Sequence, residues 1–325
     1  MNKPALLITI DTEGDNLWQS PNRIMTKNTY FLPRFQQLCE KYQFKPTWLT
    51  NYEMIKNPAY IEFSRHIIRQ NSGEIGMHLH AYNNPPLYDL TGDDKRYQPY
   101  LIEYPEEIMR NKIIYITHLL EDTLQIKIQS HRAGRWAFNV KYAQMLIEQG
   151  YKVDCSVTPR VNWQHTMGHP QREGGTNYQD FPDDSYFIDE NNISKSGNST
   201  LLEVPVTIQY KHTSLINQLQ STYYRLQGQK YNPTTHWFRP IRGNLKKMID
   251  VVKTSMKNGR DYVEFMMHSS ELMPGGSPTF KNKYDIEVLY NNLEQLFSWL
   301  QRYTISMTLS EYYSKNIKFY PKNQT

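Results

Sequence analysis

The stretch Ala5-Leu6-Leu7-Ile8-Thr9-Ile10-Asp11-Thr12-Glu13-Gly14-Asp15 indicates the fold, because a short apolar run ends directly in three carboxylates. Residues 5–10 form a continuous apolar, β-branched run, which is typical of a strand buried on both faces. If the strand geometry continues, alternation places Asp11 and Glu13 on one face, and a turn at Gly14 would let Asp15 join them. We therefore expect an acidic cluster at the mouth of a sheet or barrel.

Extended and helical patterns alternate along the rest of the chain. Such alternation predicts a parallel sheet, either a doubly wound sheet or a (β/α) barrel, with the active site at the carboxyl ends of the strands. We favour a distorted (β/α) barrel. The expected strands are 5–10, 46–50, 73–78, 130–136, 151–156, 201–206, 261–268 and 304–309, and the expected helices are 30–42, 60–71, 106–123, 139–149, 244–258 and 284–303.

Two polar segments, about 82–105 and 160–199, do not fit this alternation. Loops of that length are uncommon unless they are functional, so both are candidate lids or substrate walls. We treat 1–325 as a single domain that carries these two long loops.

Composition excludes several classes of protein. The 325 residues are 38% hydrophobic and 21% charged, as in soluble globular proteins, and the formal net charge is +5. No run of like charges and no recognisable element points to nucleic acid. Two cysteines, Cys39 and Cys155, are too few for a disulfide framework and favour a reducing compartment.

The same sequence predicts a cytoplasmic location. The apolar run that follows Met1-Asn2-Lys3-Pro4 is far shorter than a signal-peptide core, and no apolar run approaches the roughly eighteen residues that cross a bilayer. We expect at most peripheral membrane contact, and the sequence sets no oligomeric state. Basic residues between Arg239 and Arg260 could contact a diphosphate or an anionic surface, although a solvated helix face is the simpler interpretation.

His78-Leu79-His80 also follows a predicted strand. Alternation puts both imidazoles on one side of the chain, within reach of a single metal ion. Two imidazoles and one carboxylate form a common open site for zinc or another divalent ion. The acidic cluster after the first strand could provide that carboxylate.

Further polar motifs stand at other strand ends. Arg132 and Arg135, in His131-Arg132-Ala133-Gly134-Arg135-Trp136, could orient a catalytic carboxylate or clamp an anionic substrate, or could form surface ion pairs. Asp154 ends one strand and His268 ends another. An aspartate that hydrogen-bonds a histidine fixes its tautomer and raises its basicity, which suits a general acid.

The order and spacing of these motifs resemble the polysaccharide deacetylases of carbohydrate esterase family four, which include chitin, peptidoglycan and nodulation-factor deacetylases. The resemblance spans about Leu6 to Leu272. The sequence is most similar to a branch found in bacterial surface-polysaccharide gene clusters. That branch has Ile-Asp-Thr-Glu-Gly-Asp in its first motif and Glu-Ile-Gly-x-His-x-His in its second, as here at 10–15 and 74–80.

The resemblance implies a metal centre. It assigns Glu13, or Asp15 as the reserve, as the acidic metal ligand, and His78 as a histidine ligand. Members of the family normally carry the second histidine four residues after the first, where this chain has Tyr82. The resemblance therefore makes His80 the replacement ligand. Zinc is the expected ion, with cobalt, nickel and manganese as alternatives.

The resemblance also implies catalytic roles. Asp11 matches the base, Arg132 or Arg135 would keep that base ionised, and Asp154 would orient the general acid His268. Arg135 and Trp136 are the expected substrate contacts. In the first motif Thr12 replaces the second aspartate that the family usually has, and in the third motif residues 133–136 replace the usual proline-containing sequence.

The implied reaction is hydrolysis of an N-acetyl, or related acyl, group on a sugar. The expected substrate is a nucleotide-sugar, a lipid-linked sugar or an oligosaccharide of surface polysaccharide (O-antigen or capsule) synthesis. Two alternatives remain open. The chain could be a hydrolase of a different amide, or a non-catalytic carbohydrate-binding protein that lost the metal when the second motif changed.

Overall fold

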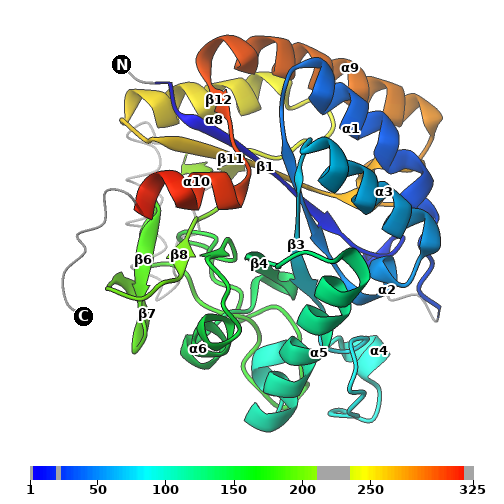
Figure 1. Ribbon diagram of the computed structural model, residues 1–325, viewed down its shortest axis with the longest axis vertical. Helices are drawn as coiled ribbons and strands as arrows, with labels where there is room; N and C mark the ends of the chain where they lie inside the picture. Colours follow the sequence, from blue (N-terminus) through cyan, green and yellow to red (C-terminus); the bar gives the residue numbers. More distant parts are fainter. Residues whose placement is uncertain (1–2, 20–22, 211–234, 318–325) are drawn as a thin grey trace, which may run out of the picture.

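The computed structural model describes residues 3–19, 23–210 and 235–317, and a curled sheet of mostly parallel strands forms its centre (Figure 1). The strand order is β11-β1-β2-β3-β4-β5-β8-β6-β7, with β12 paired to the start of β1. The strands are β1 (Ala5–Thr12), β2 (Pro46–Thr50), β3 (Glu74–Leu79), β4 (Ser130–Ala133), β5 (Val153–Asp154), β6 (Tyr186–Asp189), β7 (Asn192–Ser196), β8 (Leu202–Glu203), β9 (Ile208–Tyr210), β10 (Thr235–Trp237), β11 (Tyr262–His268) and β12 (Ile305–Ser306).

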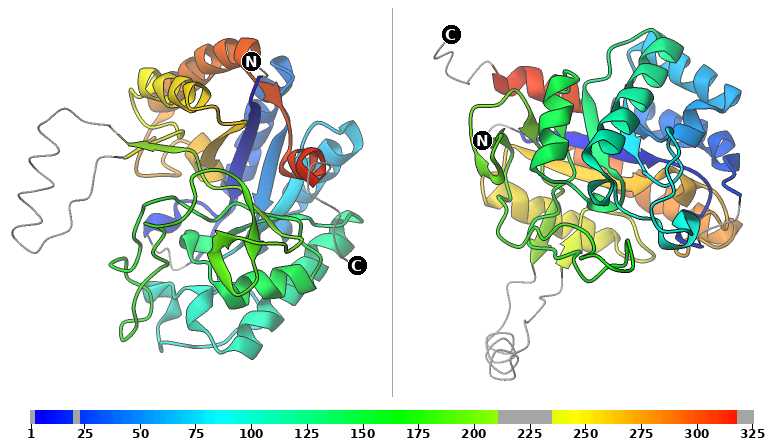
Figure 2. Two further views of the ribbon diagram at one scale, coloured as in Figure 1. Left: turned by 90° about the vertical axis from the view of Figure 1, so that its left-hand side faces the viewer. Right: turned by 90° about the horizontal axis from the view of Figure 1, so that it is seen from below.

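The helices surround this sheet (Figures 1 and 2). Each long helix places an apolar stripe against the strands, as the helical spacing of its apolar residues predicts. One continuous apolar cluster joins the helices to the outer face of the sheet. The helices are α1 (Leu32–Lys41), α2 (Tyr52–Ile55), α3 (Pro58–Gln70), α4 (Asp94–Tyr97), α5 (Glu106–Leu124), α6 (Val140–Glu148), α8 (Leu245–Lys257), α9 (Lys283–Tyr303) and α10 (Leu309–Asn316), with short 3-10 turns η1 (Leu17–Gln19), η2 (Lys27–Phe31), η3 (Leu101–Glu103), η4 (Gly134–Trp136) and η5 (Ser269–Leu272).

Strand β1 is the second strand in the sheet order and is buried along its whole length. It pairs in parallel with β11 on one side and with β2 on the other. Burial on both faces explains why its sequence is a continuous apolar run up to Ile10.

The barrel closes through single residues instead of a regular strand pair. The Phe238 backbone N–H donates to the Thr207 carbonyl at 3.0 Å, and the Met266 N–H donates to the Phe238 carbonyl at 3.2 Å. These two bonds connect the segment after β8 to β11. The predicted distorted (β/α) barrel is thus confirmed, and the distortion lies at this junction.

A second apolar cluster fills the interior of the curled sheet and includes residues of α10. Leu309 and Tyr312 of α10 are fully buried in it. The helix start is fixed by the Ser310 N–H, which donates to Glu74 Oε2 at 3.0 Å. Helix α10 therefore fills the amino-terminal end of the barrel and leaves the opposite end for a site.

The structure differs from the sequence-based expectation in several places. The strands expected over 130–136, 151–156 and 201–206 are shorter, and comprise only β4, β5 and β8. The strand expected over 304–309 is only Ile305–Ser306, and α10, which we did not predict, begins directly after it. The segment 82–105 contains α4 and η3, and 160–199 contains the β6–β7 hairpin, which extends the sheet. Among the described residues, no helix is both long and apolar enough to span a membrane.

Candidate metal and active site

The strand register brings the expected site residues to one end of the barrel. Asp11 lies opposite His268 in the β1–β11 pair, and His78 lies opposite Arg132 in the β3–β4 pair. Neighbouring residues on parallel strands point to the same side, so these four side chains share the barrel interior. All four come from the carboxyl-terminal ends of their strands, where barrel enzymes have their active sites.

Glu13, His78 and His80 form one buried cluster of potential metal ligands. Their ligand atoms all lie within 4.8 Å of one another. His80 Nε2 is 2.9 Å from Glu13 Oε2 and 3.1 Å from His78 Nε2. His78 Nε2 is 3.5 Å from the same carboxylate oxygen. Two imidazoles and a carboxylate that converge in this way fit a divalent ion such as zinc.

The surroundings of His78 support this fit. Its Nδ1 lies 2.9 Å from the Arg132 carbonyl oxygen, which can only accept a hydrogen bond. That bond places the proton on Nδ1 and leaves the Nε2 lone pair directed at the cluster, as in many metal-binding histidines. Burial raises the pKa of Glu13, but the adjacent His78, His80 and His268 imidazoles outweigh burial and hold that pKa far below its usual range, so the carboxylate stays ionised.

Asp15 does not reach this cluster. Its two carboxylate oxygens accept the backbone N–H groups of Lys27 and Asn28, each at 2.9 Å. These bonds fix the start of η2, where two backbone donors would otherwise lack partners. The geometry therefore favours Glu13 over Asp15 as the acidic ligand.

Tyr82, at the position where the family's second histidine is expected, lies outside the ligand cluster. Its ring packs edge-on against the His80 imidazole, with ring centres 5.7 Å apart. The tyrosine lines a neighbouring cavity together with Glu53 and Asn83. It thus packs against His80, which belongs to the cluster of potential ligands.

Asp11 is held by a buried arginine. Arg132 Nη1 donates to Asp11 Oδ1 at 2.6 Å, and Arg132 is fully buried. Burial would raise the pKa of Asp11, but the Arg132 guanidinium, with His78 and His268, holds that pKa below its usual value. Asp11 is therefore ionised and oriented, as a general base must be.

Arg132 also pairs with a second buried carboxyl group, which we did not predict from the sequence. Its Nη2 donates to Glu264 Oε1 and, at 2.9 Å, to Thr9 Oγ1. The other Glu264 oxygen has no hydrogen-bond partner among the described residues. Burial raises the pKa of Glu264 to about 7, although Arg132 and Thr9 oppose the shift. One guanidinium thus serves two carboxyl groups, of which Asp11 is the more readily ionised.

The predicted pairing of Asp154 with His268 is wrong. Asp154 Oδ1 instead lies 2.5 Å from His131 Nδ1, and both side chains are fully buried. His131 and Asp154 are register neighbours on β4 and β5, but each is one residue out of phase with the side chains that face the barrel interior. Asp154 therefore points outward, away from the site.

Glu271 takes the place that we expected for Asp154. Its Oε2 accepts the His268 backbone N–H at 2.8 Å and lies 3.4 Å from His268 Nδ1. Arg239 Nη2 donates to the other oxygen at 3.0 Å. Burial would raise the pKa of Glu271, but Arg239 and His268 lower it to about 2. His268 Nε2 remains free to face Asp11, 3.8 Å away.

Arg135 fastens the two long segments to the barrel mouth. Its guanidinium donates to the backbone carbonyls of Gln98 and Met167 and lies over the Tyr100 ring, 4.2 Å from the centre. Arg135 and Trp136 both have left-handed backbone angles, with φ of 55° and 63°. Such strain persists only where the surroundings enforce it, and it is common at functional sites. The arginine that we expected to bind substrate is thus engaged by the protein.

The ligand cluster, Asp11 and His268 open into one cavity of about 350 Å³. Trp18 forms part of its wall and packs edge-on against His268, with ring centres 4.8 Å apart. Sequence patterns missed Glu264, Glu271 and Trp18. Alternation along β11 could have identified Glu264, and the three-residue spacing from His268 could have identified Glu271; Trp18 has no comparable signal. The other lining residues are Leu17, Gln98, Tyr100, Arg135, Trp136, Trp163, Thr166 and Arg239.

No protein-family model and no curated protein matches the sequence. Solved structures do match. A candidate polysaccharide deacetylase from Mycobacterium smegmatis aligns over 100% of this chain and 95% of its own, with a TM-score of 0.54 and 15% identity. A candidate glycoside hydrolase/deacetylase from Parabacteroides distasonis aligns over 99% of this chain and 73% of its own, with a TM-score of 0.65 and 9% identity.

A 4-alpha-glucanotransferase from Thermococcus litoralis aligns over 97% of this chain and 41% of its own, with a TM-score of 0.57 and 14% identity. The two deacetylase structures show that the chain has the fold of the polysaccharide deacetylases. The resemblance in sequence motifs is thus confirmed at the level of fold. Because a glucanotransferase also aligns, the fold alone does not select the reaction. That choice depends on the residues at the barrel mouth.

Substitution of Arg132 by methionine should strongly destabilise the protein, because it leaves Asp11 and Glu264 buried without their cation. We expect the free energy of unfolding to fall by about 3–5 kcal/mol. Arg34→Met is the matched control, since it breaks an exposed pair with Glu287 and should cost less than about 1 kcal/mol. Urea unfolding measures both variants, and equal losses would contradict the account.

Glu264 should give stability a pH dependence. The pKa of Glu264 is raised from 4.5 to about 7 in the folded protein. The contribution of this carboxyl group to folding stability is therefore fully present below about pH 4.5 and is lost as the pH rises through about 7. Glu264→Gln removes that loss. The unfolding free energy of Glu264→Gln, relative to that of wild type, should therefore increase by on the order of 2–3 kcal/mol as the pH rises from about 5 to 7.5.

The control is Glu62→Gln, which changes an exposed carboxylate on α3. Its difference from wild type should stay constant over the same pH range in urea titrations. A constant difference for Glu264→Gln as well would show that this carboxyl group has no raised pKa.

Proposed function

We propose that this protein is a metal-dependent hydrolase that removes an N-acetyl, or related acyl, group from a sugar. One observation carries the proposal: the cluster of potential metal ligands lies in the same cavity as the Asp11 carboxylate and the His268 imidazole, two groups that can accept and donate protons. His268 Nε2 is 3.8 Å from Asp11 Oδ2 and 4.0 Å from Glu13 Oε1. A nucleophilic water and a leaving amine could both be reached from this position.

Glu13, His78 and His80 would hold the metal ion. When bound, a divalent ion supplies Lewis-acid polarisation of an acyl carbonyl and makes a nearby water more acidic. The altered second motif, with His80 and Tyr82, is compatible with this role because His80 lies beside both other ligands. Zinc is the ion that two imidazoles and one carboxylate suit best.

Asp11 acts as the base in this proposal. It takes a proton from water, whose oxygen then forms a bond to the acyl carbon. Arg132 keeps the carboxylate ionised and fixes the oxygen that does not face the cavity. A preorganised base of this kind contributes about 10²–10⁴-fold to the rate.

His268 acts as the acid. It gives a proton to the sugar nitrogen as the bond between that nitrogen and the acyl carbon breaks, so that the products are a carboxylate and a free amine. Glu271, next to Nδ1 and bonded to the His268 backbone N–H, orients the ring so that Nε2 faces the cavity. Arg135 organises the walls of the cavity, and Trp136 contributes an apolar wall for the substrate.

The proposed setting is the synthesis of surface polysaccharide in the cytoplasm. The sequence resemblance to the branch from surface-polysaccharide gene clusters supports it. Within that setting the acylated sugar belongs to an O-antigen or capsule intermediate.

Asp11→Asn should separate catalysis from metal binding. The isosteric amide cannot accept the proton, so the rate of acetate release from N-acetylated sugars should fall about 10²–10⁴-fold. Zinc affinity, measured by calorimetry, should change little. Asp15→Asn is the control and should retain the rate. Full activity in Asp11→Asn, or a variant that loses zinc together with activity, would contradict the assigned role.

A further inference from the structure

Glu264 lies deep in the barrel interior, on the same side of β11 as His268. In the β1–β11 register it pairs with Leu7, whereas His268 pairs with Asp11. The four residues from Glu264 to His268 correspond to about 13 Å along the strand. The side chain of Glu264 is fully buried. Glu264 therefore does not reach a substrate in the catalytic cavity, and any influence on the reaction must pass through another residue.

Arg132 connects Glu264 to the proposed base. Its Nη1 donates to Asp11 Oδ1 at 2.6 Å, and its Nη2 donates to Glu264 Oε1. The Thr9 hydroxyl accepts from Nη2 at 2.9 Å and donates to the same Glu264 oxygen at 2.9 Å. The Arg132 Nε donates to the Cys155 carbonyl at 3.0 Å. Because a guanidinium group is planar and its N–H directions are fixed, the bonds of Nη2 and Nε determine where Nη1 points.

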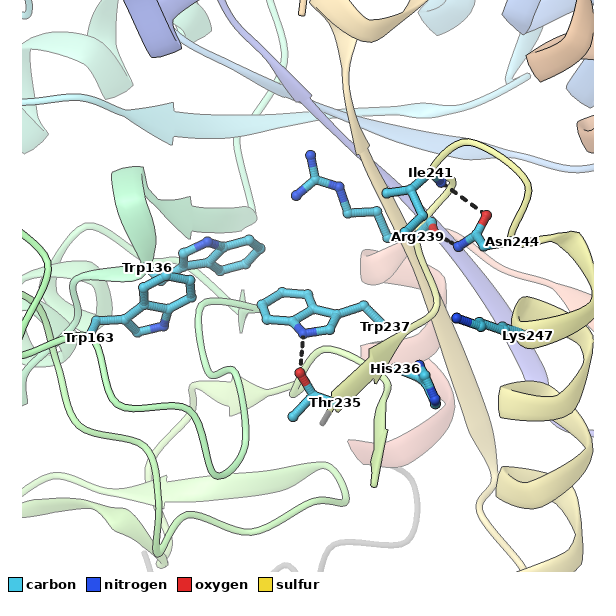
Figure 3. Close-up of a pocket in the computed structure, with 9 residues that line it drawn as sticks. All are labelled: Trp136, Trp163, Thr235, His236, Trp237, Arg239, Ile241, Asn244 and Lys247. Carbon is cyan, nitrogen blue, oxygen red and sulfur yellow. Dashed lines mark hydrogen bonds between the residues drawn. The ribbon is translucent and has the colours of Figure 1, made fainter. Parts of the chain in front are cut away.

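Trp136 covers this guanidinium on the cavity side. Arg132 Cζ lies over the Trp136 ring, 5.1 Å from its centre, and the arginine is fully buried. The Trp136 ring packs against Trp237, with ring centres 5.7 Å apart, and Figure 3 shows the two indoles next to each other. Water from the cavity therefore does not readily replace a missing acceptor of Arg132, and the protein itself must supply the acceptors.

The Arg132–Asp11 pair uses only one nitrogen of the guanidinium. An arginine and a carboxylate frequently pair through two parallel hydrogen bonds when two nitrogens are available. Here Glu264 and Thr9 occupy Nη2, so Asp11 is bonded through Oδ1. The second oxygen, Oδ2, is left toward the cavity and lies 3.8 Å from His268 Nε2. Oδ2 is therefore the oxygen that could accept a proton from water.

We propose that Glu264 is a positioning residue for the reaction: by occupying Nη2 of Arg132, it prevents two-bond pairing with Asp11 and keeps Oδ2 open to the cavity. The inference rests on the proposed function, in which Asp11 is the base, and adds the residue that determines which oxygen of the base is free. Stability alone does not explain a carboxyl group at this position. Within the part of the chain that the structure describes, Glu264 Oε2 has no hydrogen-bond partner, and a buried polar atom without a partner is costly.

The test compares Glu264→Leu with Glu264→Gln in acetate release from an N-acetylated sugar. Leucine removes the acceptor for Nη2, so Arg132 should pair with both oxygens of Asp11 and kcat should fall about 10–100-fold. Glutamine keeps an acceptor oxygen and should retain most of kcat. KM and zinc affinity should stay the same in both variants, because Glu264 touches neither substrate nor metal ligands. Glu264→Met, with a more adaptable apolar side chain, takes the place of Glu264→Leu if leucine prevents folding.

Glu203→Leu is the matched control. Glu203 is as fully buried as Glu264, but its carboxylate accepts from the Val157 backbone N–H at 3.0 Å. It pairs with Asp154 in the β5–β8 register and therefore lies on the outer face of the sheet. Whatever this variant loses in stability, kcat of the folded protein should be unchanged. Equal kcat in Glu264→Leu and Glu264→Gln, or the same loss in Glu203→Leu, would overturn the proposal.

A double-mutant cycle separates positioning from a general weakening of the site. If Glu264 acts only through Arg132 on the base, Glu264→Leu should have no further effect on the slow residual rate of Asp11→Asn. Losses that multiply in the double variant would show that Glu264 acts by another route, and the proposal would fail.

Crystal structures of the two Glu264 variants keep this test distinct from that of the proposed function. We expect two hydrogen bonds between Arg132 and Asp11 in Glu264→Leu and one in Glu264→Gln. A single bond in both variants overturns the positioning role at any level of activity. If the wild-type protein releases no acetate, the hydrolase proposal fails, while a switch to two bonds in Glu264→Leu still supports the effect of Glu264 on Oδ2.

Discussion

The alternation of side chains along parallel strands determines which residues meet in this protein. Asp11, His78, Arg132 and His268 all face the barrel interior because the register pairs them across neighbouring strands. A shift of one residue would send each of them to the helix-covered side. The contacts among these four side chains depend on which alternate residues of each strand face the barrel interior.

Because strand alternation directs charged side chains into the barrel interior, the protein must stabilise several buried charges there. Arg132 is fully enclosed and makes contacts with Asp11, Glu264, Thr9 and the Cys155 carbonyl. Such a cluster is costly to desolvate and is stable only when all partners are present. The same guanidinium that satisfies this requirement holds Asp11 in its ionised form, so the structural role and the proposed catalytic role of Arg132 cannot be separated by simple deletion.

Local periodicity predicted the alternating strands and helices and placed the polar residues at strand ends, whereas the ligand set and the catalytic roles came from the resemblance to the deacetylases. The apolar run before Asp11 and the spacing of His78 and His80 were sufficient to place these residues at one barrel end. The partner of His268 was predicted wrongly, since the phase of β5 relative to β11 is set by five successive strand pairings and not by local sequence. Helix α10 was missed because its few apolar residues pack into the barrel interior, which no local pattern reveals.

The central claim is that Glu13, His78 and His80 bind one metal ion at the barrel mouth. A crystal structure of the protein with zinc, with anomalous scattering recorded at the zinc edge, tests it most directly. The account predicts a single strong peak about 2.0–2.2 Å from Glu13 and from Nε2 of both histidines, with none at Asp15. An anomalous peak elsewhere with this cluster empty, or no peak in a crystal saturated with zinc, would contradict the claim that the cluster binds metal.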